Sequence, residues 1–293
     1  MARNPAAESA SPWWEGSVIY ELIPRCFADG NGDGIGDLDG LRQRLDYLQW
    51  LGVDAVWMTP ICDSPLRDGG YDITDYKAVH PDLGDLQALD ALIAHAHGLG
   101  LKVLFDLVLN HTSDMHLWFQ RARWAERDSP ERNFYVWRDD DSSYSDAPVL
   151  FRHFEQSNWH WDPVAGQYYL HRFLRHQPDL NYDNPQVQEA MLDVLDFWID
   201  RGIDVFRLDA IPFLFEREGT RCEGLQETHG FLRRLRTRAA ERCKQLGREE
   251  VLLLAEAIQP VQEAMPYIAD DELHSAFNFA LTAQLFASVA HGE

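Results

Sequence analysis

The stretch Gly202-Ile-Asp-Val-Phe-Arg-Leu-Asp209 decides the fold class of this chain, because an apolar run ends here in a carboxylate. A second apolar run, residues 251–255, ends in Glu256, and a third, residues 103–109, is followed by two further polar residues. In an αβ-barrel the carboxyl ends of the strands form the end that carries catalytic groups. The sequence therefore predicts an α/β fold of the (β/α)8 TIM-barrel type.

Working outward from this stretch, short apolar runs alternate with amphipathic stretches, as expected of βα units. Six strands are expected at residues 18–24, 55–59, 102–109, 204–209, 251–256 and 275–279. Helices are expected at residues 38–51, 85–98, 186–201 and 228–245. A closed barrel needs eight units. The barrel is therefore expected to be incomplete, and the chain to be an N-terminal piece of a longer protein.

The alternation stops after the third strand. The stretch that follows is rich in Trp, Tyr, His, Asp and Arg, and it is too long for an ordinary connection. We interpret residues 112–180 as an inserted domain. Residues 1–111 then form the first part of a catalytic barrel, and residues 181–293 continue the barrel up to a truncation before strands seven and eight.

Paired carboxylates at neighbouring strand ends are typical of glycoside chemistry, in which one attacks the anomeric carbon and the other protonates the leaving oxygen. Asp209 suits the nucleophile, because Arg207 lies two residues earlier on the same face of the strand and its positive charge favours an ionised carboxylate. Glu256 suits the acid. The alternative is a structural Arg–Asp pair and an unrelated surface Glu.

Four segments carry a resemblance to a known family. Asp106–His111, residues 202–209 and residues 254–256 stand in the order of three signature segments of the α-amylase family, and Gly70-Tyr71-Asp72 resembles its sugar-holding motif. The resemblance extends from Trp13 to about Phe286. Within the family, four stretches are most similar to the trehalose synthases, which interconvert maltose and trehalose: residues 47–54, 64–72, 177–182 and 218–225.

This resemblance implies retaining α-glucosyl transfer on a disaccharide, maltose or trehalose, through a covalent glucosyl–Asp209 intermediate. It also implies that the substrate is bound by a group of side chains: Tyr71, Asp72, Asp106, His111 and Arg207. No residue matches the family's third catalytic Asp, and its C-terminal β-domain is not seen in the sequence. The alternatives are a hydrolytic α-glucosidase, an inactive fragment and a non-catalytic amylase-like protein; the last typically lacks the two carboxylates that this chain keeps.

An acidic loop is predicted to bind Ca²⁺. Oxygen ligands at alternate positions, with glycines between them, let a loop curl around this ion. The expected ligands are Asp29, Asn31, Asp33, the carbonyl of Ile35, and Asp37. The loop is no EF-hand, because the twelfth position is Gly40 rather than Glu. The alternative is a solvated acidic turn. Related α-glucosidases and trehalose synthases bind a cation in this loop, and the resemblance therefore agrees.

The resemblance implies a second calcium site between the inserted domain and the barrel. Its ligands map to Asn110, Asp179, the carbonyls of Phe213 and Leu214, and Glu216. Phe213 replaces the usual Tyr, which leaves a carbonyl ligand unchanged.

The net charge is −22, from 26 basic and 48 acidic residues. Such a charge argues against nucleic acid or an anionic membrane as partner. Residues 1–12 lack the apolar core of a signal peptide, and no apolar run approaches the roughly 20 residues of a membrane span, so a cytoplasmic protein is expected. The four cysteines form no Cys-x-x-Cys pair and are expected to be free thiols. Homo-oligomer formation by the full-length protein is left open.

Overall fold

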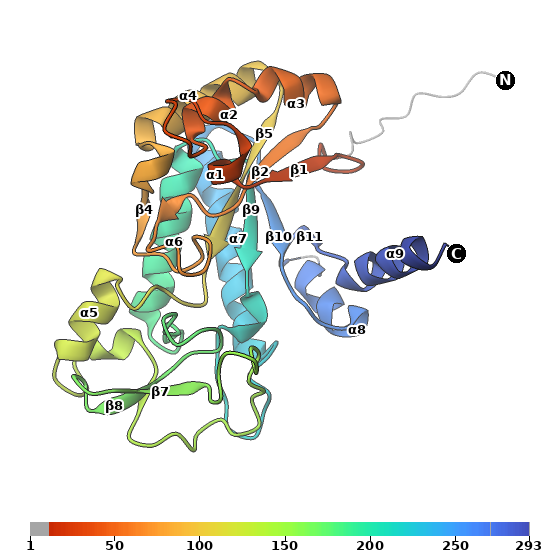
Figure 1. The fold of residues 1–293 in the computed structure, drawn as a ribbon. Helices are drawn as coiled ribbons and strands as arrows, with labels where there is room; N and C mark the ends of the chain where they lie inside the picture. Colours follow the sequence, from red (N-terminus) through yellow and green to blue (C-terminus); the bar gives the residue numbers. More distant parts are fainter. Residues whose placement is uncertain (1–11, 270, 293) are drawn as a thin grey trace.

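The computed structural model describes residues 12–269 and 271–292. The N-terminal stretch that carries no signal-peptide pattern therefore lies, up to residue 11, outside the described residues. A central sheet crosses the molecule, helices cover one side of it, and the segment that follows β5 extends beyond one end (Figure 1).

The central sheet contains six strands, and every neighbouring pair is parallel. In spatial order they are β1 (Ile19–Leu22), β2 (Ala55–Met58), β5 (Lys102–Val108), β9 (Val205–Asp209), β10 (Leu252–Ala255) and β11 (Ser275–Ala276). Spatial order follows chain order, as in a barrel wall. The prediction of an incomplete barrel with six strands is confirmed.

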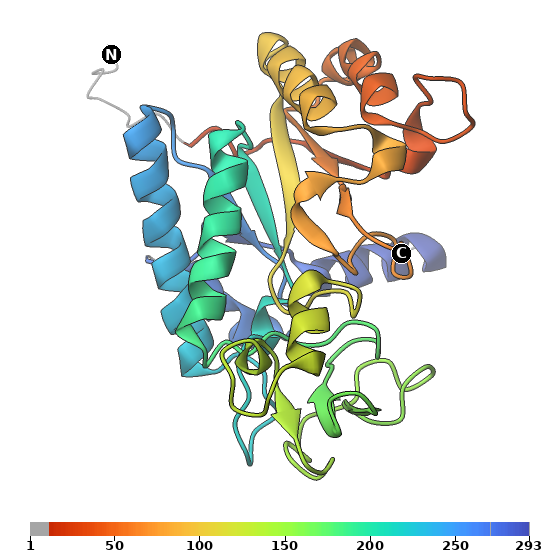
Figure 2. The same cartoon turned by 90° about the vertical axis from the view of Figure 1, so that its left-hand side faces the viewer.

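Three long helices lie along the outer face of the sheet, α4 (Leu86–Gly98), α6 (Pro185–Asp200) and α7 (Gln226–Leu246) (Figure 2). Helix α6 begins where Asn184 caps the backbone N–H of Gln186 and Pro185 takes the first helical position. Its apolar stripe is buried against the sheet. Helix α7 ends at Gly247, whose φ of 64° fits the left-handed C-terminal cap.

The remaining helices of the described residues are five of eight residues or fewer and one of 13 residues. They are α1 (Pro24–Phe27), α2 (Leu38–Arg42), α3 (Leu45–Leu51), α5 (Leu117–Trp124), α8 (Val261–Ala264) and α9 (Phe279–His291). Four 3-10 turns are η1 (Pro81–Leu83), η2 (Arg132–Phe134), η3 (Ile211–Phe213) and η4 (Met265–Ile268). None of the helices in the described residues is long and apolar enough to cross a membrane.

The predicted single helix over residues 38–51 is wrong, because α2 and α3 are separate helices joined by a turn. Leu38, Leu41, Leu45 and Leu48 are all fully buried. Apolar spacing does not distinguish one helix from two joined by a short turn when the leucines face the core in both arrangements.

The inner face of the sheet carries its own apolar cluster, formed by Leu104, Val205, Leu252 and Leu254. Trp13 and Trp14 pack against it from the N-terminal segment. Since side chains alternate along a strand, the intervening residues face the helices instead. The sheet is thus apolar on both faces, as barrel strands are.

Residues 112–180 contain a small antiparallel sheet with strands β6 (Trp137–Arg138), β8 (Gln167–Leu170) and β7 (Trp159–Asp162) in that order. Isolated bridges join His111 to Asp179 and Tyr135 to Leu180. The exact limits of an inserted domain stay a prediction. A hairpin that the sequence did not indicate, β3 (Cys62–Asp63) with β4 (Asp75–Val79), lies between β2 and α4.

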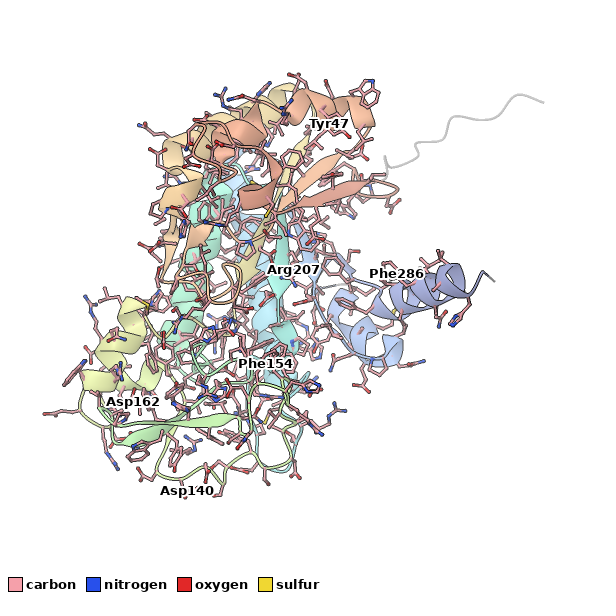
Figure 3. All side chains as sticks on the ribbon, viewed as in Figure 1. Tyr47, Asp140, Phe154, Asp162, Arg207 and Phe286 are labelled. Atoms are coloured by element: carbon pink, nitrogen blue, oxygen red, sulfur yellow. The ribbon has the colours of Figure 1, made fainter. Side chains whose placement is uncertain are left out.

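Helix α9 projects from the body of the molecule and has no buried residue among those described (Figure 1). Phe286 lies on it, far from Arg207 at the centre of the protein (Figure 3). Arg207 belongs to strand β9 of the sheet, and the segment that carries Phe154 and Asp162 lies beyond the end of that strand (Figure 3).

Candidate active site

Asp209 and Glu256 lie side by side at the carboxyl ends of neighbouring strands. Asp209 is the last residue of β9, and Glu256 directly follows β10. The two strands are parallel, with Leu208 opposite Ala255, and the backbone N–H of Glu256 donates to the carbonyl of Leu208 at 3.1 Å. The structure therefore places both carboxylates at one end of the sheet, as the two apolar runs indicated.

Arg207 links these carboxylates to each other. Its Nη1 donates to Oδ1 of Asp209 at 2.6 Å, and its Nη2 lies 2.5 Å from Oε1 of Glu256. The second oxygen of Glu256 accepts the backbone N–H of Ala210 at 3.0 Å. One planar guanidinium with several donors thus fixes the positions of both acids.

A third carboxylate, Asp106 on β5, shares the same guanidinium. Its Oδ1 lies 2.5 Å from Nη1 of Arg207, since Asp106 and Arg207 are register partners on adjacent strands. Its Oδ2 accepts from the indole of Trp57 at 2.9 Å and from the hydroxyl of Tyr71 at 3.3 Å. Asp106 therefore lies beneath Arg207 and orients it.

Burial dominates the electrostatics of this cluster. Burial raises the pKa of Asp209 well above its usual value, Arg207 opposes this rise, and the charges of Glu256 and Asp106 add to it. Burial likewise raises the pKa of Asp106 to about 6, against the lowering effect of Arg207. The expectation that Arg207 lowers the pKa of Asp209 is correct for its direct effect but omits this larger effect of burial.

A cavity of about 670 Å³ opens above these acids. Arg207, Asp209 and Glu256 line its floor. Its other walls come from the hairpin region, from residues 111–173 and from the loops that follow β9 and β10: Asp68, Tyr71, His111, Pro148, Val149, Leu150, Phe151, Phe173, Ala210, Phe213, Arg221, Glu223 and Ile258. The volume fits within the usual range of small-molecule sites.

His111 lines this cavity and is almost fully buried. Burial lowers its pKa to about 4, so the ring is neutral at pH 7. The side-chain amide of Gln177 donates to Nε2 of His111 at 3.2 Å and to Oδ2 of Asp68 at 2.8 Å. Gln177 and Asp68 were not selected from the sequence, although both lie in the stretches similar to trehalose synthases.

Asp72 does not line the cavity. It is fully buried, and its carboxylate accepts from the hydroxyl of Ser64 at 2.9 Å and from the backbone N–H groups of Arg67 and Asp68, each at 3.1 Å. In this structure Asp72 holds the 64–72 loop in shape. The neighbouring Tyr71 reaches the cavity. Its ring centroid lies 5.5 Å from the central carbon of the Arg207 guanidinium.

The acidic loop at residues 29–37 is held by its own hydrogen bonds. Asp29 accepts the backbone N–H groups of Asn31, Gly32 and Gly34, and Asp33 accepts that of Ile35. Asp37 caps α2 through the N–H of Gly40. In the described part of the chain, no three His, Cys, Asp or Glu side chains are grouped as metal ligands. Calcium binding by Asp29, Asn31, Asp33, Ile35 and Asp37 stays a prediction.

The second predicted metal position fits a cation better. Oδ1 of Asn110 and Oε1 of Glu216 are buried and have no hydrogen-bond partner. Burial raises the pKa of Asp179 to about 7 and that of Glu216 well above its usual value, and Asp179 contributes to the rise at Glu216. Buried oxygens without a hydrogen-bond partner, and carboxylates that repel each other, are suitable ligands for Ca²⁺.

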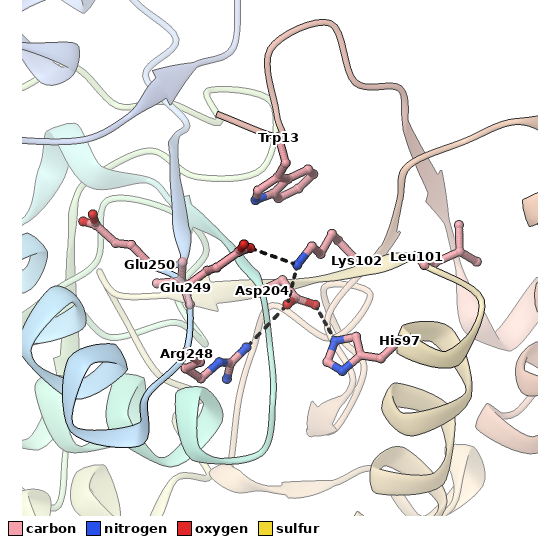
Figure 4. A pocket seen from close by; sticks show the side chains of 10 residues that line it. Trp13, His97, Leu101, Lys102, Asp204, Arg248, Glu249 and Glu250 are labelled. Atoms are coloured by element: carbon pink, nitrogen blue, oxygen red, sulfur yellow. Dashed lines mark hydrogen bonds and ion pairs between the residues drawn. The ribbon is translucent and has the colours of Figure 1, made fainter. Parts of the chain in front are cut away.

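A second cavity, of about 410 Å³, lies at the opposite end of the strands (Figure 4). Asp204 lies at its centre. The carboxylate oxygens of Asp204 lie 2.7 Å from Nε2 of His97, 3.4 Å from Nη2 of Arg248 and 3.7 Å from Nζ of Lys102. Asp204 and Asp209 are five residues apart along one extended chain, so roughly 17 Å separates them at ~3.3 Å per residue. This ion-pair network joins the amino ends of the strands, the end of a barrel that supports stability rather than catalysis.

Comparison with known proteins agrees with this geometry. Residues 21–292 match the family model for the α-amylase catalytic domain. The chain belongs to the α-amylase family. Its fold, its strand order and the carboxylates at its strand ends are consistent with that membership.

Three relatives show the range of activities around this α-amylase-family chain. It is 52% identical to the trehalose synthase/amylase of Mycolicibacterium smegmatis over 282 residues, which is 94% of this chain and 46% of that protein. It is 49% identical to the trehalose synthase of Thermus thermophilus over 278 residues, 94% of this chain and 28% of that protein. An oligo-1,6-glucosidase of Heyndrickxia coagulans is 39% identical over 279 residues, which is 91% of this chain and 50% of that protein.

Solved structures are similar over nearly the whole chain. The trehalulose synthase MutB of Pseudomonas mesoacidophila has a TM-score of 0.83 and 35% identity, over 92% of this chain and 50% of that one. The α-glucosyl transfer enzyme XgtA has a TM-score of 0.82 and 39% identity, over 96% of this chain and 58% of that one. The chain thus spans about half the length of these relatives and solved structures, except for the Thermus thermophilus protein, of which it spans 28%.

Proposed function

We propose that this chain carries the nucleophile and the acid of a retaining glucosyl transferase that interconverts maltose and trehalose. The observation that supports it is the shared guanidinium of Arg207, which holds Asp209 and Glu256 together on the floor of one cavity. Identity to two trehalose synthases favours isomerisation over other reactions of the family. A disaccharide substrate is consistent with an inactive MutB variant whose structure contains isomaltulose.

In the first step the Asp209 carboxylate attacks C1 of the non-reducing glucose of maltose. The bond from C1 to the bridging oxygen breaks, and Glu256 supplies the proton that this oxygen takes up. Hydrogen bonds from Arg207 stabilise the charged form of Asp209 against the effect of burial. The products are a covalent glucosyl–Asp209 ester and one glucose.

In the second step the glucose stays in the cavity, turns, and presents its anomeric hydroxyl to C1. Glu256 takes the proton from that hydroxyl, the ester bond to Asp209 breaks, and trehalose forms. Isomerisation requires that water be kept from C1 while the glucose turns. The neutral ring of His111 would hydrogen-bond the sugar, and its position among the residues that line the cavity supports this role.

Calcium is proposed at Asn110, Asp179 and Glu216, with the carbonyls of Phe213 and Leu214. The bound ion would supply positive charge to two buried carboxylates and would join the segment 112–180 to the loop after β9. This position is supported by the unpartnered oxygens of Asn110 and Glu216.

The test uses the full-length product of the gene that encodes this sequence, called the full-length polypeptide below, supplied with maltose. Trehalose should be the main product, with a small amount of glucose. Asp209→Asn and Glu256→Gln should each lower kcat, by about 10²–10⁴-fold for the general acid. The first step of Glu256→Gln, measured as a burst of fluoride release, should recover on α-glucosyl fluoride, whose leaving group needs no proton, whereas Asp209→Asn should release no burst. Equal recovery of both variants would contradict the assigned roles.

A hydrolytic α-glucosidase is the second candidate, favoured by the identity to the oligo-1,6-glucosidase. The same residues would serve, with water in place of the returning glucose. Glucose as the sole product from maltose would establish this alternative. An inactive fragment is the third, and it is tested by comparing residues 1–293 with the full-length polypeptide.

A further inference from the structure

Arg172 connects the inserted segment to the loop that follows β9. Its side chain is 1% exposed, although it carries a full charge. Its Nη1 donates to the carbonyl of Cys222 at 3.1 Å and to that of Arg221 at 3.4 Å. A buried arginine bonded to backbone carbonyls holds those backbones in place, because breaking the bonds would leave a buried charge without partners.

The same guanidinium makes three further contacts. Its Nη2 donates to the carbonyl of Pro148 at 3.4 Å and pairs with Oε1 of Glu223 at 3.7 Å. Its central carbon lies over the ring of Phe213, 4.9 Å from the centroid. One side chain therefore contacts three separate stretches, around residues 148, 213 and 222.

These stretches form the wall of the cavity that faces the catalytic floor. Pro148 and Phe151 line it from the inserted segment, and Phe213 and Glu223 line it from the loop after β9. Arg172 itself is not among the lining residues, so it acts from behind the wall.

The loop after β9 depends on outside contacts for its shape. Cys222 has a φ of 52°, in the left-handed region that non-glycine residues rarely adopt. A residue in such a conformation persists only where its surroundings hold it. The bond from Arg172 to the carbonyl of Cys222 is one of these constraints.

We propose that Arg172 is a positioning residue that holds this wall together and thereby decides how much of the glucosyl–Asp209 ester is captured by glucose rather than by water. The proposal rests on the function proposed above. In both outcomes the ester bond to Asp209 breaks, a new bond forms from C1 to an oxygen, and that oxygen's proton passes to Glu256. The oxygen comes from the retained glucose when the wall is closed, and from water when the wall opens.

Arginine is required here for its shape. A lysine keeps the positive charge beside Glu223, but its single ammonium cannot reach the carbonyls of Pro148 and Cys222 together. Arg172→Lys is therefore the informative change, because it keeps the buried charge and removes only the link. Arg175→Lys is the matched control, since Arg175 lies three residues away, is 56% exposed and pairs with Glu155.

The experiment uses the full-length polypeptide with maltose and measures the ratio of glucose to trehalose. Arg172→Lys should raise this ratio several-fold with total maltose consumption little changed, and Arg175→Lys should leave it unchanged. Limited trypsin digestion should cut faster after Arg221 in Arg172→Lys only, since the loop is released. An unchanged product ratio overturns the proposal, whether or not digestion changes.

Failure of the proposed function is visible separately. If the wild-type protein makes no trehalose, isomerisation is rejected by the wild type alone. The ratio of glucose to other glucosyl-transfer products then replaces the ratio to trehalose. Equal ratios in wild type and Arg172→Lys, or equal digestion rates after Arg221, again overturn the role of Arg172.

Discussion

Arg207 and Glu256 come from neighbouring strands, and their side chains meet with Nη2 of the arginine 2.5 Å from Oε1 of the glutamate. The same guanidinium also binds Asp209 and Asp106. One positive charge is therefore shared by three carboxylates, of which Asp106 and Asp209 are buried and Glu256 is partly exposed. Three carboxylates against one guanidinium leave the cluster with excess negative charge, which favours the uptake of a proton, as expected of a site that must donate and accept protons.

Arg207→Lys should lower kcat/KM on maltose by about 100-fold or more, since disrupting a buried ion cluster costs ~3–5 kcal/mol. The ammonium cannot bond Asp106, Asp209 and Glu256 together. Steady-state kinetics on the full-length polypeptide measure the loss, and circular dichroism checks the fold. Arg201→Lys is the control, because Arg201 lies away from the cavity, where it pairs with Asp90 and lies over the ring of Phe197. A loss below tenfold would remove Arg207 from its central role.

Asp106 makes stability depend on pH. Its pKa is raised to about 6 by burial, so its contribution to stability is fully present below its unfolded pKa of about 4 and is lost as the pH rises through 6. The free energy of unfolding of wild type, relative to Asp106→Asn, should fall by about 3 kcal/mol between pH 4 and pH 7.5. Urea unfolding at several pH values measures this. A difference that does not vary with pH contradicts it.

Calcium should bind at two positions. Calorimetry on the full-length polypeptide should count two ions per chain in wild type and one in each of Asp33→Ala and Glu216→Gln, because each variant loses one carboxylate ligand. Removing calcium with a chelator should lower the melting temperature of wild type and of both variants.

The two positions are told apart by which variant loses an ion. Asp33→Ala with an unchanged count and melting temperature would show that residues 29–37 form only a turn. Glu216→Gln with an unchanged count would reject the position at Asn110 and Asp179.

Helix α9 should promote self-association of residues 1–293. Phe286 and Val289 are 75% and 80% exposed on it, and apolar side chains gathered on one exposed face associate in water. Sedimentation of this chain should show oligomers or aggregates, and the double change Phe286→Ser with Val289→Ser should reduce them. Trp124→Ser, at a residue equally exposed on α5, is the control and should have little effect.

Residues 1–293 alone should also be nearly inactive on maltose compared with the full-length polypeptide. The reason is that no residue matches the third catalytic Asp expected from the family. A monomer that melts cooperatively and matches the full-length rate would contradict both this expectation and the one about α9.

Strand existence and order could be predicted from the sequence, because apolar runs bounded by turn residues carry a local pattern. All six strands of the central sheet lie where such runs were found. The break between α2 and α3 could not be predicted, since Leu41 and Leu45 are buried in either arrangement. The small sheet of β6, β7 and β8 was also missed, because its strands are short and carry no regular alternation.

The sequence by itself determined that Arg207 and Asp209 share a face and that Glu256 stands at the same end of the sheet, because side chains alternate along a strand and parallel strands share an end. Only the tertiary structure decided that Asp106 joins them, that Asp72 is turned into its own loop, and that Arg172 binds the wall from behind. Those three contacts join residues that are 101, 8 and 50 positions apart in the chain, and the register between strands and the packing of loops bring them together. Local periodicity determines the direction of a side chain, whereas its partner is determined by the fold.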